Sequence, residues 1–119
     1  MKKDTLSGLD IDLYSEKFSN GFEVYLVPLK NMKRYYATYA TKYGSLITEF
    51  CPNGSRKNVK VPNGIAHFLE HKMFEKEDGH VLEKFPLIGG SSNAFTSYTH
   101  TVYQVSGTEK FYDNLNLLI

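Results

Sequence analysis

The feature that most constrains the fold is a change of hydrophobic period along the chain. In the first third, apolar side chains such as Val24 and Leu26 alternate with polar ones, which is typical of half-buried strands. Over residues 64–75 the period becomes helical, and over residues 94–105 it returns to alternation. The pattern predicts a domain that combines strands and helices.

Turn residues divide these segments. Asn20-Gly21 lies between two alternating runs, and this pair favours a β-hairpin with a type I′ turn because both residues tolerate positive φ. The other expected elements are a third strand over residues 35–47, an exposed loop over 51–63, a helix over about 80–88 and a helix from Thr108 onward.

Composition limits the partners that the chain can have. Its 119 residues fit one domain, and a formal net charge of +1 gives no reason to expect a nucleic-acid partner. No apolar stretch approaches the roughly 20 residues of a membrane span. The start, Met-Lys-Lys-Asp, lacks the apolar segment of a secretory signal. We therefore expect a cytoplasmic location with no membrane partner, and a free loop thiol at the single cysteine, Cys51.

The segment with the most specific chemistry is His67-Phe-Leu-Glu70-His71. At roughly 100° per residue, these three polar residues share one side of the predicted helix. The two imidazoles are one turn apart, a separation at which both can bind one metal ion. A carboxylate beside the metal can take a proton from the bound water and deliver it to a leaving amine. The spacing predicts metal ligands at His67 and His71 and a general base at Glu70.

The opposite face of this helix is apolar. Ile65, Phe68, Leu69 and Met73 lie there, and we expect them to anchor the helix to the sheet.

Histidines at this spacing also occur as exposed pairs that hydrogen-bond to each other. However, the chain has only four histidines, and two of them follow the H-x-x-E-H order. The other two, His80 and His100, lie near expected turns, and we expect them to be exposed and not to bind metal.

Two motifs together give the chain a family resemblance. The first is His67-Phe-Leu-Glu-His71, and the second is Gly89-Gly-Ser-Ser-Asn-Ala-Phe-Thr-Ser97 with Thr101-Val-Tyr103. In this order they resemble the insulinase-type (M16, inverzincin) zinc metallopeptidases, closest to the bacterial cytoplasmic members. The resemblance runs from about Phe18 to the end.

The resemblance implies a fold and a set of roles. The fold is α+β, with a largely antiparallel sheet and helices packed on one face, as in mitochondrial-processing-peptidase-like metallohydrolases. The cofactor is Zn²⁺ held by His67 and His71, and Glu70 activates the water. The strand that includes Asn93, Ala94 and Phe95 is an edge that binds the peptide substrate, in agreement with the general physics of strand addition.

The chain departs from the family at the third zinc ligand. Family members use a glutamate that falls past Ile119, and none of the acidic residues after His71 within this chain takes its position. Residues 1–119 are therefore expected to be the N-terminal part of an M16 domain, truncated before that ligand and inactive alone. The expected partners are a peptide substrate and the remaining M16 domains or a homologous partner chain.

Two other functions remain open at this point. A non-catalytic, peptide-binding subunit of an M16-type heterodimer is one, although such subunits typically lose the H-x-x-E-H residues that are intact here. A small metal-dependent lyase of the S-ribosylhomocysteine type is the other. That enzyme recruits a cysteine after the helix, whereas Cys51 precedes it.

Overall fold

The structure, a computed structural model, describes residues 1–52, 54–76 and 79–119. It divides into two compact units, residues 1–33 and residues 34–119, and each is considered by itself.

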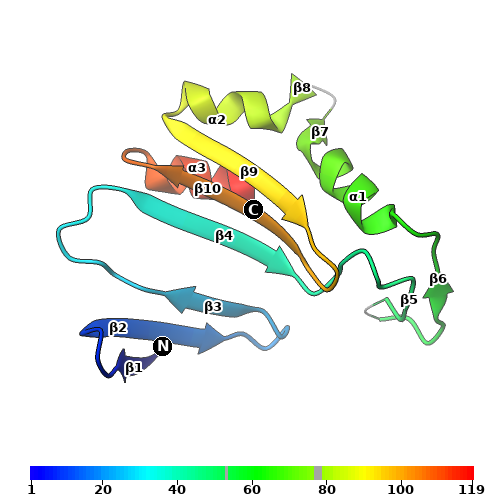
Figure 1. The fold of residues 1–119 in the computed structure, drawn as a ribbon, viewed down its shortest axis with the longest axis horizontal. Coiled ribbons are helices and arrows are strands. Elements are labelled where there is room, and N and C mark those ends of the chain that lie inside the picture. Colours follow the sequence, from blue (N-terminus) through cyan, green and yellow to red (C-terminus); the bar gives the residue numbers. More distant parts are fainter. Residues whose placement is uncertain (53, 77–78) are drawn as a thin grey trace. The chain divides into compact units, whose positions relative to one another are not determined.

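The N-terminal unit is a three-stranded antiparallel sheet in the order β1-β2-β3 (Figure 1). Its strands are β1 (Lys2–Leu6), β2 (Ile11–Lys17) and β3 (Glu23–Leu26). The predicted hairpin joins β2 to β3 and is confirmed, but the type I′ turn is wrong. Only Gly21 in this loop has a positive φ, 86°, because the loop closes as a turn from Phe18 to Gly21, in which the Gly21 N–H donates to the Phe18 carbonyl at 2.9 Å.

The C-terminal unit is built on a second antiparallel sheet, in the order β4-β10-β9. Its strands are β4 (Tyr35–Thr41), β10 (Thr101–Gly107) and β9 (Gly90–Thr96). Two short ribbons flank this sheet and are formed by β5 (Glu49–Phe50) with β6 (Val59–Lys60), and by β7 (Glu75–Lys76) with β8 (Gly79–His80). The strand predicted over residues 35–47 is therefore shorter than expected.

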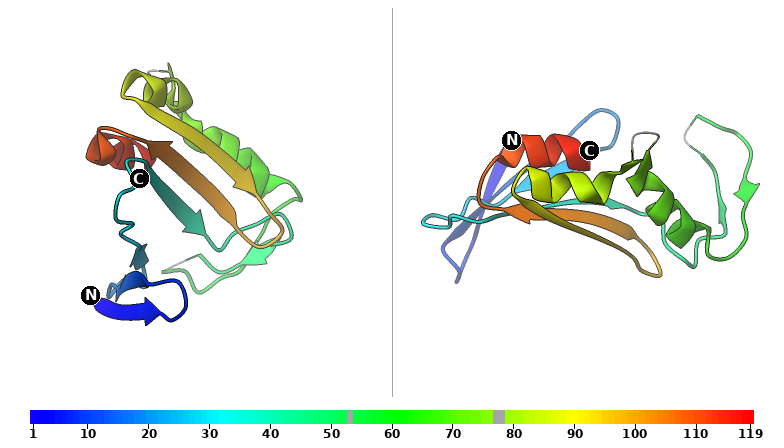
Figure 2. Two further views of the ribbon diagram at one scale, coloured as in Figure 1. Left: turned by 60° about the vertical axis from the view of Figure 1, so that its left-hand side comes forward. Right: turned by 90° about the horizontal axis from the view of Figure 1, so that it is seen from above.

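The helices of this unit lie on one face of the sheet (Figure 2), as the family resemblance implies. They are α1 (Ile65–Phe74), the 3-10 turn η1 (Val81–Glu83), α2 (Lys84–Leu87) and α3 (Phe111–Leu118). Strand β10 turns its odd-numbered residues, from Thr101 to Gly107, toward this layer. The buried core between the layers consists of Phe74, Val81, Phe85 and Val105. The fold class is confirmed as α+β with antiparallel sheets.

The start of β9 depends on a close contact with α3. Asn114 is fully buried, and its amide donates to the backbone oxygens of Ile88 and Lys110 at 3.2 and 3.1 Å. A Cβ on Gly90 would lie 1.9 Å from the Asn114 side-chain oxygen. Gly90 is therefore required by packing, because a larger residue at the start of β9 would clash with Asn114 on α3.

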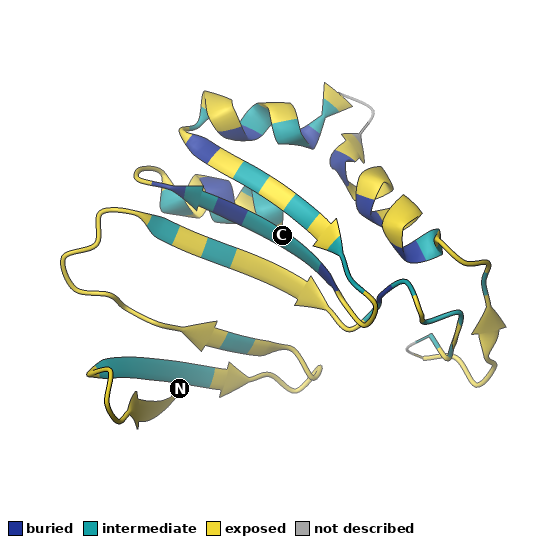
Figure 3. Ribbon diagram, viewed as in Figure 1, coloured by how far each residue is buried: buried dark blue, intermediate teal, exposed yellow. Residues whose placement is uncertain are grey.

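The packing face of α1 differs from the prediction. Phe68 and Met73 are each 56% exposed and Leu69 is 43% exposed, while Ile65 is half-buried. Most of the expected anchor therefore does not face the sheet, and much of α1 is exposed (Figure 3). The buried residues are Ala66, Glu70 and Phe74, which are four apart and form one stripe. Ala66 and Phe74 supply the apolar contact, and the carboxylate between them finds a hydroxyl partner on the sheet.

Helix ends also differ in detail. Helix α1 follows Gly64, at φ 87°, and α3 follows Lys110 rather than beginning at Thr108. The helix expected over about 80–88 is split into β8, η1 and α2, in keeping with Pro86, which cannot donate an i to i−4 hydrogen bond. The predicted helix break at Glu77-Asp78 lies outside the described residues. None of the described helices is long and apolar enough to cross a membrane.

Candidate metal and catalytic site

The two predicted metal ligands converge on a single point. The Nε2 atoms of His67 and His71 are 3.0 Å apart, and the ring centroids are 4.8 Å apart. Both rings are exposed on α1. The helical spacing thus brings the same nitrogen of each ring to one place, as the sequence predicts.

This separation fits a shared zinc ion. Tetrahedral zinc with Zn–N distances of about 2.0–2.1 Å places two ligand nitrogens about 3.3 Å apart, so only a slight opening of the pair is needed. Binding through Nε2 requires neutral rings that carry their proton on Nδ1. The same separation is a hydrogen bond between the rings when one Nε2 is protonated, so metal binding has to be measured.

A third ligand is not found among the residues that the structure describes: no group of three His, Cys, Asp or Glu side chains there could hold a metal ion. Glu75 is the acidic residue that follows most closely, and its carboxylate instead pairs with Lys72 at 2.6 Å. Glu77 and Asp78 lie outside the described residues. His67 and His71 are therefore two candidate ligands, fewer than the three that a catalytic zinc site normally uses.

Glu70, the predicted general base, is buried between α1 and β9, with 7% of its surface exposed. The Thr96 hydroxyl donates to Glu70 Oε2 at 2.7 Å. Behind it, the Thr101 hydroxyl lies 3.4 Å from the Thr96 hydroxyl and donates to the Tyr43 carbonyl at 2.8 Å. The burial of the carboxylate is compensated because a hydroxyl satisfies one of its oxygens.

The sequence motif includes Thr96 and Thr101, but their partnership with Glu70 was missed. A signal exists, since Thr96 has the same parity as Ala94 and therefore faces the helices. A hydroxyl at an inward-facing strand position requires a partner. The sequence does not reveal the register of β9 on β10. That register pairs Thr96 with Thr101 and brings both hydroxyls to the sheet face that packs on α1.

The charge of Glu70 affects the pKa of a neighbouring tyrosine, Tyr103. Burial raises the pKa of Tyr103, and the charges of Glu70 and Tyr39 raise this pKa further. The Tyr103 ring also packs edge-on against Phe74 at 5.5 Å. Tyr103 therefore remains a neutral, uncharged wall beside Glu70 at neutral pH.

Strand β9, which carries Asn93, Ala94 and Phe95, is at the edge of its sheet. At the turn that follows, Ser97 N–H donates to His100 O at 2.8 Å, so residues 97 and 100 form a hydrogen-bonded pair. Since such pairs alternate along an antiparallel ladder, Ala94 is in a non-hydrogen-bonded pair. Its backbone N–H and C=O point away from β10, to the free edge.

The three residues of this predicted substrate strand have different surroundings. Asn93 Oδ1 accepts a hydrogen bond from the Ala94 N–H at 2.9 Å, so the Asn93 side chain already binds the N–H that points to the free edge. Ala94 itself is half-buried against the core, while Phe95 is 45% exposed on the sheet face that points away from the helices. Of these three residues, Ala94 is the one whose backbone N–H and C=O point to the free edge, and the Asn93 side chain covers that N–H.

The remaining candidate residues lie apart from the histidine pair. His100 is exposed, as predicted, and its Nδ1 lies 3.0 Å from the Ser97 hydroxyl. His80 is half-buried and stacks on Phe74 at 6.2 Å, so its predicted exposure is wrong. Cys51 is a free, exposed cysteine that donates to the Ser55 carbonyl, as expected of a loop thiol.

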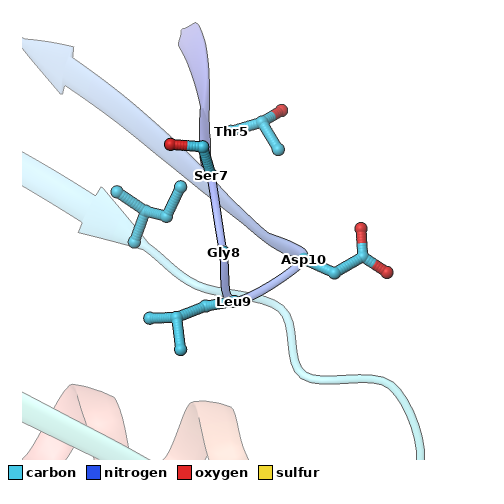
Figure 4. A pocket seen from close by; sticks show the side chains of 6 residues that line it. Thr5, Ser7, Gly8, Leu9 and Asp10 are labelled. Carbon is cyan, nitrogen blue, oxygen red and sulfur yellow. The ribbon is translucent and has the colours of Figure 1, made fainter.

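A shallow hollow in the N-terminal unit offers no competing site. It is lined by residues 5–10 at the turn between β1 and β2 (Figure 4). Asp10 is the one titratable side chain in its lining. A single carboxylate in an open turn provides neither a metal site nor an acid–base pair.

Known proteins resemble this chain in sequence and in structure. The family model described as "Insulinase (Peptidase family M16)" matches residues 39–118. A Bacillus subtilis (strain 168) protein named "Uncharacterized zinc protease YmfH" is 52% identical over 107 residues, covering 90% of this chain and 25% of that protein. The beta subunit of the mitochondrial-processing peptidase of Blastocladiella emersonii is 43% identical over 56 residues, covering 43% of this chain and 12% of the subunit.

A solved structure agrees with these relatives. The crystal structure of an M16-like peptidase from Alicyclobacillus acidocaldarius matches 97% of this chain with a TM-score of 0.83 and 36% identity, and 26% of that protein is covered. The chain thus spans about a quarter of the length of this protein and of the Bacillus relative. The matches in sequence and fold show that the chain belongs to the insulinase family, peptidase family M16.

Proposed function

We propose that this chain carries the metal-binding and proton-transfer residues of a zinc metalloendopeptidase. His67 and His71 hold Zn²⁺, and Glu70 is the general base for peptide hydrolysis. The observation that carries the proposal is the convergence of the two Nε2 atoms, 3.0 Å apart, one turn from a buried carboxylate with an ordered hydroxyl partner. The zinc proteases among its relatives support the choice of metal.

Each residue has a separate chemical task. When bound, zinc supplies Lewis acidity, which lowers the pKa of water to about 7 and polarises a carbonyl. Glu70 accepts a proton from the attacking water and later gives it to the leaving amine. Tyr103 lies near enough to the carboxylate for the Glu70 charge to raise its pKa, and its ring, packed on Phe74, limits the access of bulk water.

The free edge of β9 is the proposed binding site for the peptide. An extended substrate adds to a sheet edge through main-chain hydrogen bonds, which are independent of sequence. The Ala94 N–H is the donor that such a peptide uses, and a substrate carbonyl replaces Asn93 Oδ1 there. Phe95, exposed on the other face of the sheet, contributes to the strand and does not contact the metal.

Completion of the site requires further protein. Catalytic zinc sites normally have three protein ligands and one open position, and the described residues offer two. We propose that residues 1–119 are the N-terminal part of an M16 domain, and that a carboxylate from the rest of such a domain, or from a homologous partner chain, is the third ligand. This chain joined to the remaining three quarters of the Bacillus relative is called the completed peptidase below.

Zinc binding by the 119-residue chain tests the ligand assignment. With two protein ligands we expect weak binding, detected by calorimetric titration, because affinity grows with ligand number and geometry. His67→Ala and His71→Ala should each abolish it. His100→Ala is the matched control and should bind as the unsubstituted chain does. Unchanged binding in both His67→Ala and His71→Ala would show that the metal is held elsewhere.

The proposed peptide edge is tested by proline at Ala94 in the completed peptidase. Proline removes the N–H that points to the free edge and leaves the ladder with β10 intact. One hydrogen bond contributes about 0.5–1.5 kcal/mol, so KM should rise by up to about tenfold with kcat little changed. Phe95→Pro is the contrasting variant, since its N–H lies in the ladder and its loss should destabilise the fold. An unaltered KM in a folded Ala94→Pro protein would contradict the edge assignment.

A further inference from the structure

The hydroxyl groups behind Glu70 have a defined direction of hydrogen bonding. The Thr101 hydroxyl donates its one hydrogen to the Tyr43 carbonyl, 2.8 Å away. Its oxygen can therefore only accept a further hydrogen bond. Thr96 could donate to Thr101 at 3.4 Å or to Glu70 Oε2 at 2.7 Å. The shorter bond to a charged acceptor is the stronger one. The Thr96 hydrogen is therefore directed at Glu70 Oε2.

The backbone around Thr96 is held in place at the end of β9. Ser45 N–H donates to Ser97 O at 2.9 Å, and Leu46 N–H donates to Tyr98 O at 3.1 Å. A Cβ on Gly44 would lie 2.5 Å from the His100 nitrogen, so the segment that precedes Leu46 crosses this turn in close contact. These backbone contacts leave Thr96 little freedom to move relative to β10.

On the other side of the Thr96–Glu70 hydrogen bond, Glu70 is held in place by the packing of its helix, α1. Ala66 and Phe74, one turn before and one turn after it, are buried with 3% and 7% exposure, which holds the helix against the sheet. Among the described residues, Thr96 is the hydrogen-bond partner of the carboxylate, and it donates to Oε2. The other oxygen, Oε1, is left to accept a proton.

We infer that Thr96 is a positioning residue for the general base: its hydroxyl fixes the Glu70 carboxylate through Oε2 and orients Oε1 toward the reacting water. This inference rests on the proposed function of Glu70. The proton moves from water to Oε1 and then to the leaving amine, while Oε2 keeps its hydrogen bond throughout. The Thr96 hydroxyl acts through Glu70.

Three variants of the completed peptidase test this role, with kcat, KM and bound zinc measured for each. Thr96→Val keeps the shape and removes the hydroxyl, and kcat should fall by about 10- to 100-fold, the usual effect of losing an orienting partner. KM and zinc content should not change. Thr96→Ser restores the hydroxyl and should recover most of the turnover. Thr38→Val is the control, an exposed threonine on β4, which β10 separates from β9, and it faces away from the helices.

A second measurement does not depend on activity. In NMR spectra of the unsubstituted 119-residue chain, the Thr96 hydroxyl proton should be protected from exchange and show a nuclear Overhauser effect to the Glu70 side chain. The absence of that contact would overturn the inference, and this measurement decides the matter if Thr96→Val does not fold.

The outcomes separate the inference from the proposed function. If Glu70→Gln is inactive but Thr96→Val keeps full kcat, the positioning role is wrong and the proposed function stands. If Glu70→Gln itself keeps full turnover, the proposed function fails and the inference fails with it. A loss of kcat in both Thr96→Val and Thr96→Ser would also reject the hydroxyl as the cause.

Discussion

Replacing Glu70 by glutamine in the completed peptidase is expected to slow peptide cleavage at least about 100-fold while zinc remains bound. The amide oxygen can still accept the Thr96 hydrogen bond, which in the unsubstituted chain joins Thr96 to Oε2 at 2.7 Å, so the helix should keep its position on the sheet. The group that then faces the water is an NH₂, which cannot accept a proton. General acid–base catalysis contributes about 10²–10⁴-fold, and kcat should fall by this factor.

Zinc content and turnover must be measured on the same samples, so that loss of metal is not mistaken for loss of the base. Glu75→Gln is a suitable control, because Glu75 is exposed and pairs with Lys72. It should leave cleavage unchanged. Near-normal turnover by Glu70→Gln, with zinc bound, would show that a different group takes the proton.

The 119-residue chain alone is expected to have no measurable peptidase activity, even when it folds and binds zinc. Two histidines leave the metal without the third ligand that catalytic sites normally use. The substrate also lacks walls that orient it and exclude water, and correct positioning alone contributes about 7–11 kcal/mol to catalysis. Cleavage of an unstructured peptide should therefore appear only in the completed peptidase, compared at equal protein and equal bound zinc.

A contrary result would be informative about this chain. If the short chain cleaves as fast as the completed peptidase, and Glu70→Gln abolishes that cleavage, a carboxylate within these 119 residues must complete the site. Acid-to-amide substitutions at each acidic residue after His71 would then test for it: Glu75, Glu77, Asp78, Glu83, Glu109 and Asp113. If Glu70→Gln leaves the cleavage in place, a contaminating peptidase is responsible.

Features that depend on near neighbours in the chain were predictable. The one-turn spacing of His67 and His71 requires only that the segment be helical, because helix geometry then brings the two rings together. The hairpins at Asn20-Gly21 and before Thr101 follow from alternation and turn chemistry in the same way. Even so, the predicted type of the first turn was wrong, since the loop closes through a hydrogen bond from Gly21 N–H to Phe18 O and only Gly21 has a positive φ.

The packing of α1 could not be predicted from its own sequence. A hydrophobic count along the helix favours the face with Phe68, Leu69 and Met73, yet that face is exposed. The stripe with Glu70 is buried instead, and its carboxylate is accommodated because the Thr96 hydroxyl on β9 donates to it. Thr96 is 26 residues from Glu70 in the sequence. No local pattern contains that information.

The sequence by itself determined the family, most of the elements and the one-turn spacing of His67 and His71, since these follow from periodicity and from motifs within one helix or hairpin. Only the tertiary structure decided which atom of Glu70 is held, which backbone groups of β9 face the free edge, and which side of α1 is buried. The physical reason is that these properties arise from contacts between segments that are far apart in the chain. Their geometry is set by sheet register and packing, not by the order of residues within any one segment.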